Sequence, residues 1–198
     1  MPAPALKSSI PWAMVSARVL LCPVIVFGAA RGWDGRWLGL IVLFALVDDI
    51  YDGILARRWG CDTELLRRAD SAADTIFYLG VAAALWLREP RLLKDNWRLL
   101  ALLGTLEIVR HLFDRWKFGK AAAYHSLLAK LWGLVMGIAV TGVLSFGGPR
   151  WLVWVSLLLG IASDLEGLAI SLMLPRWKND VKTLAAAWRL RQIMLQPD

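Results

Sequence analysis

The chain has 198 residues, 58% of them hydrophobic, and a formal net charge of +7 at pH 7. This apolar content, with a mean hydropathy of +0.53, excludes an ordinary soluble domain and indicates a membrane protein. Lysine and arginine cluster in short loops between apolar runs, which favours positive-inside membrane topology over nucleic-acid binding.

Six apolar segments follow one another along the chain, and we interpret each as a membrane-spanning helix. They cover residues 11–30, 38–55, 70–87, 99–113, 124–146 and 151–174. The predicted fold class is therefore all-α: a polytopic membrane protein with six transmembrane helices. No repeat or linker divides the chain, so we expect a single domain over residues 1–198.

The first segment contains an arginine well inside its apolar run. Pro11 suits the start of a helix, and Pro23 predicts a kink within it. Because a cation at this depth is costly in lipid, Arg18 is expected to face a polar pocket, although snorkelling to the interface is an alternative.

Two pairs of aspartates stand where the second segment ends and the third begins. Asp49 and Asp52 are three residues apart, and Asp70 and Asp74 are four apart, so each pair lies on one helix face. A short basic loop joins the two segments. We therefore expect antiparallel neighbouring helices that bring both pairs together at one membrane surface.

The later segments carry isolated charges within apolar sequence. The fourth contains Glu107 and Arg110, which are spaced to pair across one helical turn. Asp164 and Glu166 in the sixth segment are candidate buried partners of Arg18. The basic tail from Pro175 shows helical spacing of apolar residues, which predicts a surface helix.

Six spans place both termini, the acidic pairs and the larger share of lysine and arginine on one side. We assign this side to the cytoplasm, although the loop at residues 88–98 is also basic. The expected location is a cell membrane of the bacterial inner-membrane type, crossed several times, with both termini and the acidic pairs cytoplasmic.

Four clustered carboxylates require counter-charge. Divalent Mg²⁺ or Mn²⁺ would supply it, because such cations prefer hard oxygen ligands and often complete their coordination with substrate phosphates. The alternative is a charge network at the helix ends that is balanced by nearby arginines. These are Arg57, Arg58, Arg67 and Arg68.

The stretch from Asp49 to Asp74 resembles the signature of the CDP-alcohol phosphatidyltransferase family. Within this family, the chain most resembles the phosphatidylglycerophosphate synthase-like subtype. The family signature is D-x2-D-G-x2-A-R, followed after a short gap by G-x3-D-x3-D. The matching positions are Asp49, Asp52, Gly53, Ala56, Arg57, Asp70 and Asp74. Leu66 stands where the signature has glycine, which either narrows a nucleotide pocket or reflects a shifted loop. Asp48 stands at a position where members of the family commonly have Ser or Thr.

The resemblance implies a six-helix fold with a cytoplasm-facing polar cavity, often in a homodimer. It implies that Asp49, Asp52, Asp70 and Asp74 hold two divalent cations, Mg²⁺ or Mn²⁺, which bind the diphosphate of CDP-diacylglycerol. Gly53, Ala56 and Arg57 would line the donor-nucleotide pocket. Asp74 would accept the proton of an acceptor hydroxyl during phosphatidyl transfer and CMP release.

Four residues near the predicted cytoplasmic ends of the fourth and fifth segments are candidates for acceptor binding. They are Arg110, Lys120, His125 and Lys130. A cluster of cations favours an acceptor that carries its own phosphate, so glycerol 3-phosphate is the first choice. An inositol-type or other alcohol is the alternative.

Other functional classes also place acids in membrane proteins. A membrane prenyltransferase binds diphosphate through Asp-rich motifs but usually lacks the D-G-x2-A-R continuation. A small transporter would carry its acids nearer the bilayer midplane. A non-catalytic membrane protein that retains the motif is the third alternative, and metal-dependent CMP release separates it from an enzyme.

Overall fold

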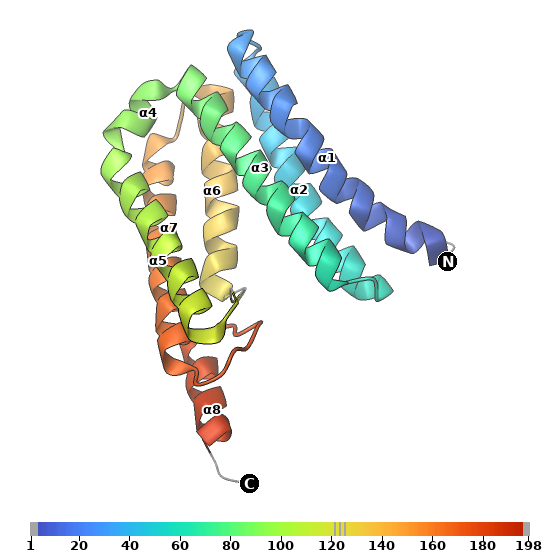
Figure 1. Cartoon of the computed structure of the whole chain (residues 1–198). Helices are drawn as coiled ribbons and strands as arrows, with labels where there is room; N and C mark the ends of the chain where they lie inside the picture. Colours follow the sequence, from blue (N-terminus) through green and yellow to red (C-terminus); the bar gives the residue numbers. More distant parts are fainter. Residues whose placement is uncertain (1–3, 121, 123, 125, 196–198) are drawn as a thin grey trace. The chain divides into compact units, whose positions relative to one another are not determined.

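The computed structural model describes the backbone of residues 4–120, 122, 124 and 126–195, and side chains from Ser9 onward. Within this part of the chain the structure is helical and contains no strand (Figure 1). The helices are α1 (Pro4–Ala30), α2 (Gly35–Trp59), α3 (Glu64–Arg88), α4 (Pro90–Asp95), α5 (Trp97–Phe118), α6 (Leu127–Phe146), α7 (Arg150–Met173) and α8 (Leu184–Leu195).

The six predicted segments coincide with α1, α2, α3, α5, α6 and α7, and the predicted tail helix is α8. Pro11 was a wrong helix start, because α1 begins at Pro4 and contains both Pro11 and Pro23. The short helix α4 within the polar loop was not predicted. Its first residue is proline, which suits a helix start because that position needs no intrahelical N–H bond.

The all-α membrane fold is confirmed, and three helical segments in the described chain are long and apolar enough to cross a bilayer. They are Ser9–Ala30, Leu127–Phe146 and Arg150–Met173. The helices α2, α3 and α5 carry more charged residues along their lengths. A count of six spans therefore stays a prediction.

The chain divides into two compact units. Unit 1 comprises residues 1–93 and 137–149, and unit 2 comprises residues 94–136 and 150–198. The boundary passes through α6, whose first half belongs to unit 2 and whose second half belongs to unit 1.

In unit 1, α1 packs against both α2 and α3. A Cβ atom on Gly80 of α3 would lie 2.7 Å from the Cys22 sulfur, so glycine allows close approach to α1. On α2, a Cβ at Gly39 would overlap the Ser145 hydroxyl of α6. Small residues at helix contacts let backbones approach in membrane proteins, where packing replaces the hydrophobic effect.

In unit 2, α7 packs against α5 and α8. A buried hydrophobic cluster contains residues from four parts of the chain: the segment before α6, helix α7, the segment after α7, and helix α8. Its buried members are Ala122, Tyr124, Ile170, Leu174, Val181 and Ala187. The predicted surface helix α8 therefore has one face anchored in unit 2, through Ala187.

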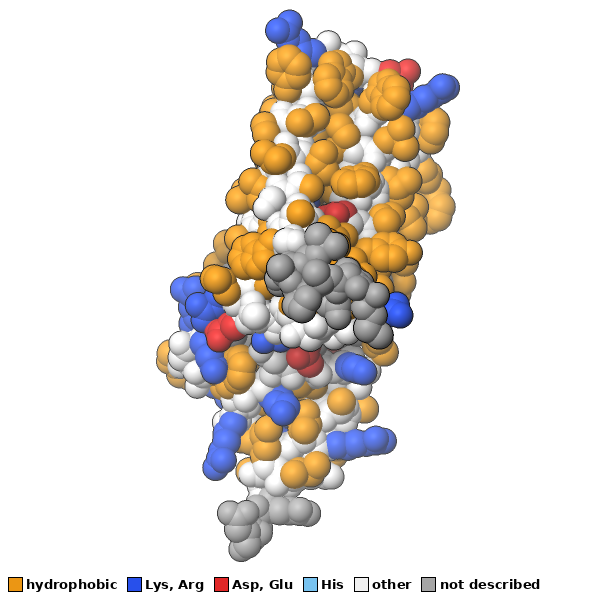
Figure 2. Space-filling model, turned by 90° about the vertical axis from the view of Figure 1, so that its right-hand side faces the viewer, with side chains coloured by type: hydrophobic (Ala, Val, Ile, Leu, Met, Phe, Trp, Pro, Cys, Tyr) orange, Lys and Arg blue, Asp and Glu red, His pale blue; other side chains and the backbone are white. Residues whose placement is uncertain are grey.

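Many large apolar side chains lie on the outside of the helices. Figure 2 shows hydrophobic side chains over much of the face turned toward the viewer. Phe44 of α2, Leu79 of α3 and Trp154 of α7 are more than half exposed. Such outward-facing apolar surface is expected where the surrounding solvent is lipid.

Candidate functional site

A tight loop brings the end of α2 next to the start of α3. Gly60 ends α2 in the left-handed region (φ 68°), and its N–H bonds the Ala56 and Arg57 carbonyls. Thr63 caps α3 by accepting a hydrogen bond from the Leu66 N–H at 3.2 Å. The chain thus reverses within a few residues, and the four signature aspartates fall on neighbouring helices.

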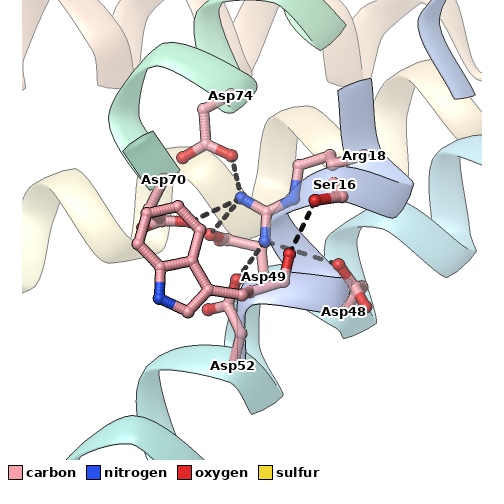
Figure 3. Close-up of polar contacts among 8 residues, drawn as sticks. Ser16, Arg18, Asp48, Asp49, Asp52, Asp70 and Asp74 are labelled. Atoms are coloured by element: carbon pink, nitrogen blue, oxygen red, sulfur yellow. Dashed lines mark hydrogen bonds and ion pairs between the residues drawn. The ribbon is translucent and has the colours of Figure 1, made fainter. Parts of the chain in front are cut away.

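Arg18 of α1 lies at the centre of the aspartates. Its side chain is 1% exposed, and its Nη1 lies 2.8 Å from Asp70 Oδ1 and 3.4 Å from Asp49 Oδ1. The same nitrogen also donates to Asp74. Figure 3 shows the guanidinium surrounded by carboxylates. The expectation that Arg18 faces a polar pocket is therefore confirmed, and the alternative that it snorkels to the membrane interface is wrong.

The other terminal nitrogen of Arg18 turns toward α2. Nη2 donates to Asp52 and lies 3.4 Å from Asp48 Oδ2, and both of these carboxylates are buried (Figure 3). We name the five carboxylates that contact Arg18 the aspartate cluster: Asp48, Asp49, Asp52, Asp70 and Asp74. Five carboxylates around one guanidinium leave a large excess of negative charge when all are ionised.

The donor set of the aspartate cluster fits a divalent cation. Asp49, Asp70 and Asp74 each offer a carboxylate oxygen, and these three oxygens lie within 4.8 Å of one another. Asp52 lies outside this group and contacts Arg18. Carboxylate oxygens are the ligands that Mg²⁺ and Mn²⁺ prefer, and the excess of negative charge calls for more positive charge than Arg18 provides.

Two arginines in the first turns of α3 pair with carboxylates outside the aspartate cluster. Arg67 pairs with Asp62 at 3.3 Å, and Arg68 pairs with Glu64 at 2.5 Å. The alternative that nearby arginines balance the signature aspartates therefore fails for these two residues. The counter-charge comes from α1, which is distant in sequence.

The three predicted nucleotide-binding residues differ in their surroundings. Arg57 is exposed, and its guanidinium folds back over Gly53, where a Cβ would lie 3.3 Å from Arg57 Nη1. Ala56 is buried in a core cluster together with Val15 and Leu66. Its small side chain is thus used in helix packing.

Leu66 occupies the signature's glycine position, and it packs inside unit 1. It is 5% exposed and belongs to the same core cluster as Val15, Ala56 and Ala73. The side chain therefore fills space between α1, α2 and α3, where a glycine would leave a cavity.

The predicted acceptor-binding residues that the structure describes, Arg110, Lys120 and Lys130, belong to unit 2. Arg110 Nη2 lies 2.8 Å from Glu107 and its Nε lies 3.2 Å from Asp164. The expected Glu107 partnership is confirmed, whereas the pairing of Asp164 with Arg18 was wrong. Lys120 is exposed, with its ammonium 3.5 Å from the centre of the Trp177 ring.

The remaining two acceptor candidates give less structural information. Lys130 is exposed in the first turn of α6. His125 lies outside the described residues.

A buried polar network in unit 2 was missed by the sequence reading. Asp114 is fully buried and accepts hydrogen bonds from the Ser171 hydroxyl at 2.5 Å and the Ala122 N–H at 3.4 Å. The Tyr124 and Ser171 hydroxyls are 2.8 Å apart. The sequence offered one signal, the position of Asp114 directly after the apolar run of residues 99–113. Such a position indicates a buried carboxylate but does not identify its hydrogen-bond partners.

Comparison with known proteins identifies a family. The model of the CDP-alcohol phosphatidyltransferase family matches residues 8–162, which is most of the chain and includes the whole aspartate cluster. No curated protein and no solved structure matches the chain.

Proposed function

The chain belongs to the CDP-alcohol phosphatidyltransferase family, and from this premise we propose that it transfers a phosphatidyl group from CDP-diacylglycerol to a small alcohol. Membership makes it a membrane phosphotransferase of phospholipid biosynthesis. The donor lipid, the acceptor, the metal and the residue roles that follow are proposals.

One observation carries the proposal: three carboxylates from two helices converge within 4.8 Å. Asp49, Asp70 and Asp74, with Asp52 beside them, would hold two divalent cations, Mg²⁺ or Mn²⁺. When bound, such cations neutralise the diphosphate and stabilise charge on the phosphoryl centre and its leaving group.

Asp74 is proposed as the general base. Its carboxylate accepts the proton of the acceptor hydroxyl while the hydroxyl oxygen forms a bond to the phosphorus on the lipid side of the diphosphate. The bond from that phosphorus to the bridging oxygen breaks, and the bridging oxygen leaves with CMP.

Arg57 is proposed to bind the donor's phosphates, because an exposed guanidinium can donate two parallel hydrogen bonds to them. Gly53 leaves room for the Arg57 side chain to lie along α2. Ala56 would support the nucleotide pocket by allowing α1, α2 and α3 to pack closely behind it.

Glycerol 3-phosphate is the proposed acceptor, supported by the exposed cations Lys120 and Lys130. Arg110 and His125 complete the proposed acceptor set. One observation favours a second candidate: Arg110 is already paired with Glu107 and Asp164, which leaves its charge less available to a phosphate. That observation supports an inositol-type acceptor without phosphate.

The proposed setting is a cell membrane of the bacterial inner-membrane type. Six spans would place both termini and the aspartate cluster on the cytoplasmic side. The chain would form one domain, and its aspartate cluster would line a polar cavity that faces the cytoplasm. A homodimer is proposed on the family resemblance alone.

The test is CMP release from CDP-diacylglycerol in detergent micelles, with Mg²⁺, with Mn²⁺ and with neither. The acceptor panel contains glycerol 3-phosphate, inositol phosphate, inositol, serine and phosphatidylglycerol. We expect metal-dependent release that is fastest with glycerol 3-phosphate. Fastest release with free inositol or serine would refute the acceptor assignment, and no metal-dependent release with any acceptor would refute the enzyme.

A further inference from the structure

Arg18 contacts the carboxylates that a divalent cation would need. Its Nη1 is within hydrogen-bonding reach of Asp49, Asp70 and Asp74, which are the three residues whose oxygens lie within 4.8 Å of one another. A cation bound by these three oxygens would lie next to a guanidinium nitrogen of like charge. The cation and the Arg18 guanidinium therefore compete for the same three carboxylates.

The guanidinium has a second set of partners that does not overlap with this group. Nη2 contacts Asp48 and Asp52, both buried on α2. The Nε of Arg18 is also buried and has no hydrogen-bond partner among the described residues. Arg18 is therefore held by its two terminal nitrogens, one on each side of the cluster.

We propose that Arg18 is a built-in counter-cation of the aspartate cluster that yields its Nη1 contacts when a divalent cation binds. The Nη2 contact to Asp48, a buried carboxylate outside the proposed metal ligands, remains and keeps the guanidinium beside the cluster. This inference rests on the proposed function, because it takes Asp49, Asp70 and Asp74 as metal ligands.

The proposal makes Arg18 a competitor of the metal, and this distinguishes it from a merely structural arginine. Removal of a competitor strengthens metal binding, and it also leaves the metal-free cluster with uncompensated repulsion. Removal of a structural arginine that only orients the carboxylates would weaken metal binding. The two roles thus predict opposite signs for one measurement.

The experiment titrates Mn²⁺ into the full-length protein in detergent and follows free Mn²⁺ by electron paramagnetic resonance. Arg18→Met keeps an unbranched, flexible side-chain stem and removes the charged guanidinium. We expect its Mn²⁺ dissociation constant to fall about tenfold or more relative to the wild type. Without metal, its unfolding temperature should be lower than that of the wild type, and saturating Mn²⁺ should restore much of the difference.

Two further variants keep the test decisive. Arg68→Met removes an exposed positive charge that pairs with Glu64 on the same helix as Asp70, so it controls for the loss of one charge nearby. Its Mn²⁺ dissociation constant should stay within about twofold of the wild type, because exposed charges are screened. Arg18→Lys cannot contact both sides of the cluster at once, and its dissociation constant should lie between those of wild type and Arg18→Met.

The outcomes separate this inference from the function on which it rests. If the wild type binds Mn²⁺ and both Arg18 variants bind it equally or more weakly, Arg18 is not a competitor and the inference is wrong. If neither the wild type nor any variant binds Mn²⁺, the proposed metal site itself is wrong. Tighter binding in both Arg18 variants, with Arg68→Met unchanged, supports the proposal.

Discussion

Asp74 illustrates how the surroundings of one side chain define its expected chemistry. It is only partly exposed, it contacts Arg18, and it belongs to the group of three converging carboxylates. A carboxylate in such a position is suited both to ligate a cation and to accept a proton.

We expect Asp74→Asn to reduce CMP release at least about 100-fold, because an amide is a poor base and a weaker ligand. Thermal unfolding in detergent should show that the fold persists. Asp62→Asn is the control, since Asp62 is an acid of the loop that pairs with Arg67. It should retain activity within about twofold, as expected for an exposed ion pair. Unchanged turnover in Asp74→Asn would remove Asp74 from the mechanism.

Leu66 provides a second prediction for a single residue. Leu66→Gly restores the signature residue but empties a core site, so we expect it to destabilise unit 1 by about 3–5 kcal/mol. Leu65→Gly is the matched control, because Leu65 is 67% exposed and should cost only about 1 kcal/mol. Thermal or denaturant unfolding measures both. Faster CMP release without loss of stability would show instead that Leu66 narrows the nucleotide pocket.

The sequence predicted the convergence of Asp49, Asp52, Asp70 and Asp74, because helical spacing and a short loop are local constraints. It did not identify the partners of Arg18, which lie on two other helices. Charge alone made Asp164 an equally reasonable partner. Which acid meets which base depends on packing between helices, and this information is not contained in the spacing of one segment.

At the scale of helices, the contact between α2 and α6 in unit 1 depends on an absent side chain. A Cβ at Gly39 would lie 3.0 Å from the Thr141 carbonyl oxygen and would overlap the Ser145 hydroxyl. Glycine is thus required by the distance between the helices and not by its backbone conformation.

We expect Gly39→Ala to destabilise the protein by about 1–3 kcal/mol, because the added methyl group forces the two helices apart. Gly104→Ala on α5 is the control, since a Cβ there meets nothing within 4 Å. Alanine is the better helix former, so this control should be neutral or stabilising by up to about 1 kcal/mol. Equal unfolding temperatures for both variants would contradict the packing argument.

Long apolar runs made the six main helices predictable, and the tail helix α8 followed from its helical spacing. The ends were less predictable. Pro11 is a typical first residue of a helix, yet α1 continues before it. The short helix α4 was missed because its few residues read as a polar loop. Local sequence preferences define the existence of a long apolar helix better than they define its ends.

At the scale of the whole molecule, the family match extends over residues of both units. The number of membrane spans could not be fixed from hydropathy, because α2, α3 and α5 carry clustered or paired charges that lower their apolar character. The acceptor is equally hard to deduce, since its candidate residues are common interfacial cations whose roles depend on tertiary placement.

Metal removal should affect the stability of the protein as well as its activity. A ligand that binds only the folded state at 100 times its dissociation constant stabilises it by about 2.7 kcal/mol. We therefore expect EDTA to stop CMP release and to lower the unfolding temperature, and Mg²⁺ or Mn²⁺ to reverse both effects.

The control for this experiment is a double variant, Asp49→Asn with Asp70→Asn, in which EDTA and added metal should no longer change the unfolding temperature. A metal-dependent shift that persists in the double variant would place the stabilising cation elsewhere.

The burial of Arg18 among aspartates of later helices also has a consequence for biosynthesis. The ribosome completes α1 before Asp48 or Asp74 exists, so the nascent helix carries an unpaired cation into the membrane. An arginine within a lone inserted helix costs up to about 3 kcal/mol on insertion scales, with the largest cost at the helix centre. Stable integration of α1 should therefore wait for the α2–α3 hairpin, and a nascent chain that ends after α1 should insert poorly unless Arg18 is replaced by leucine.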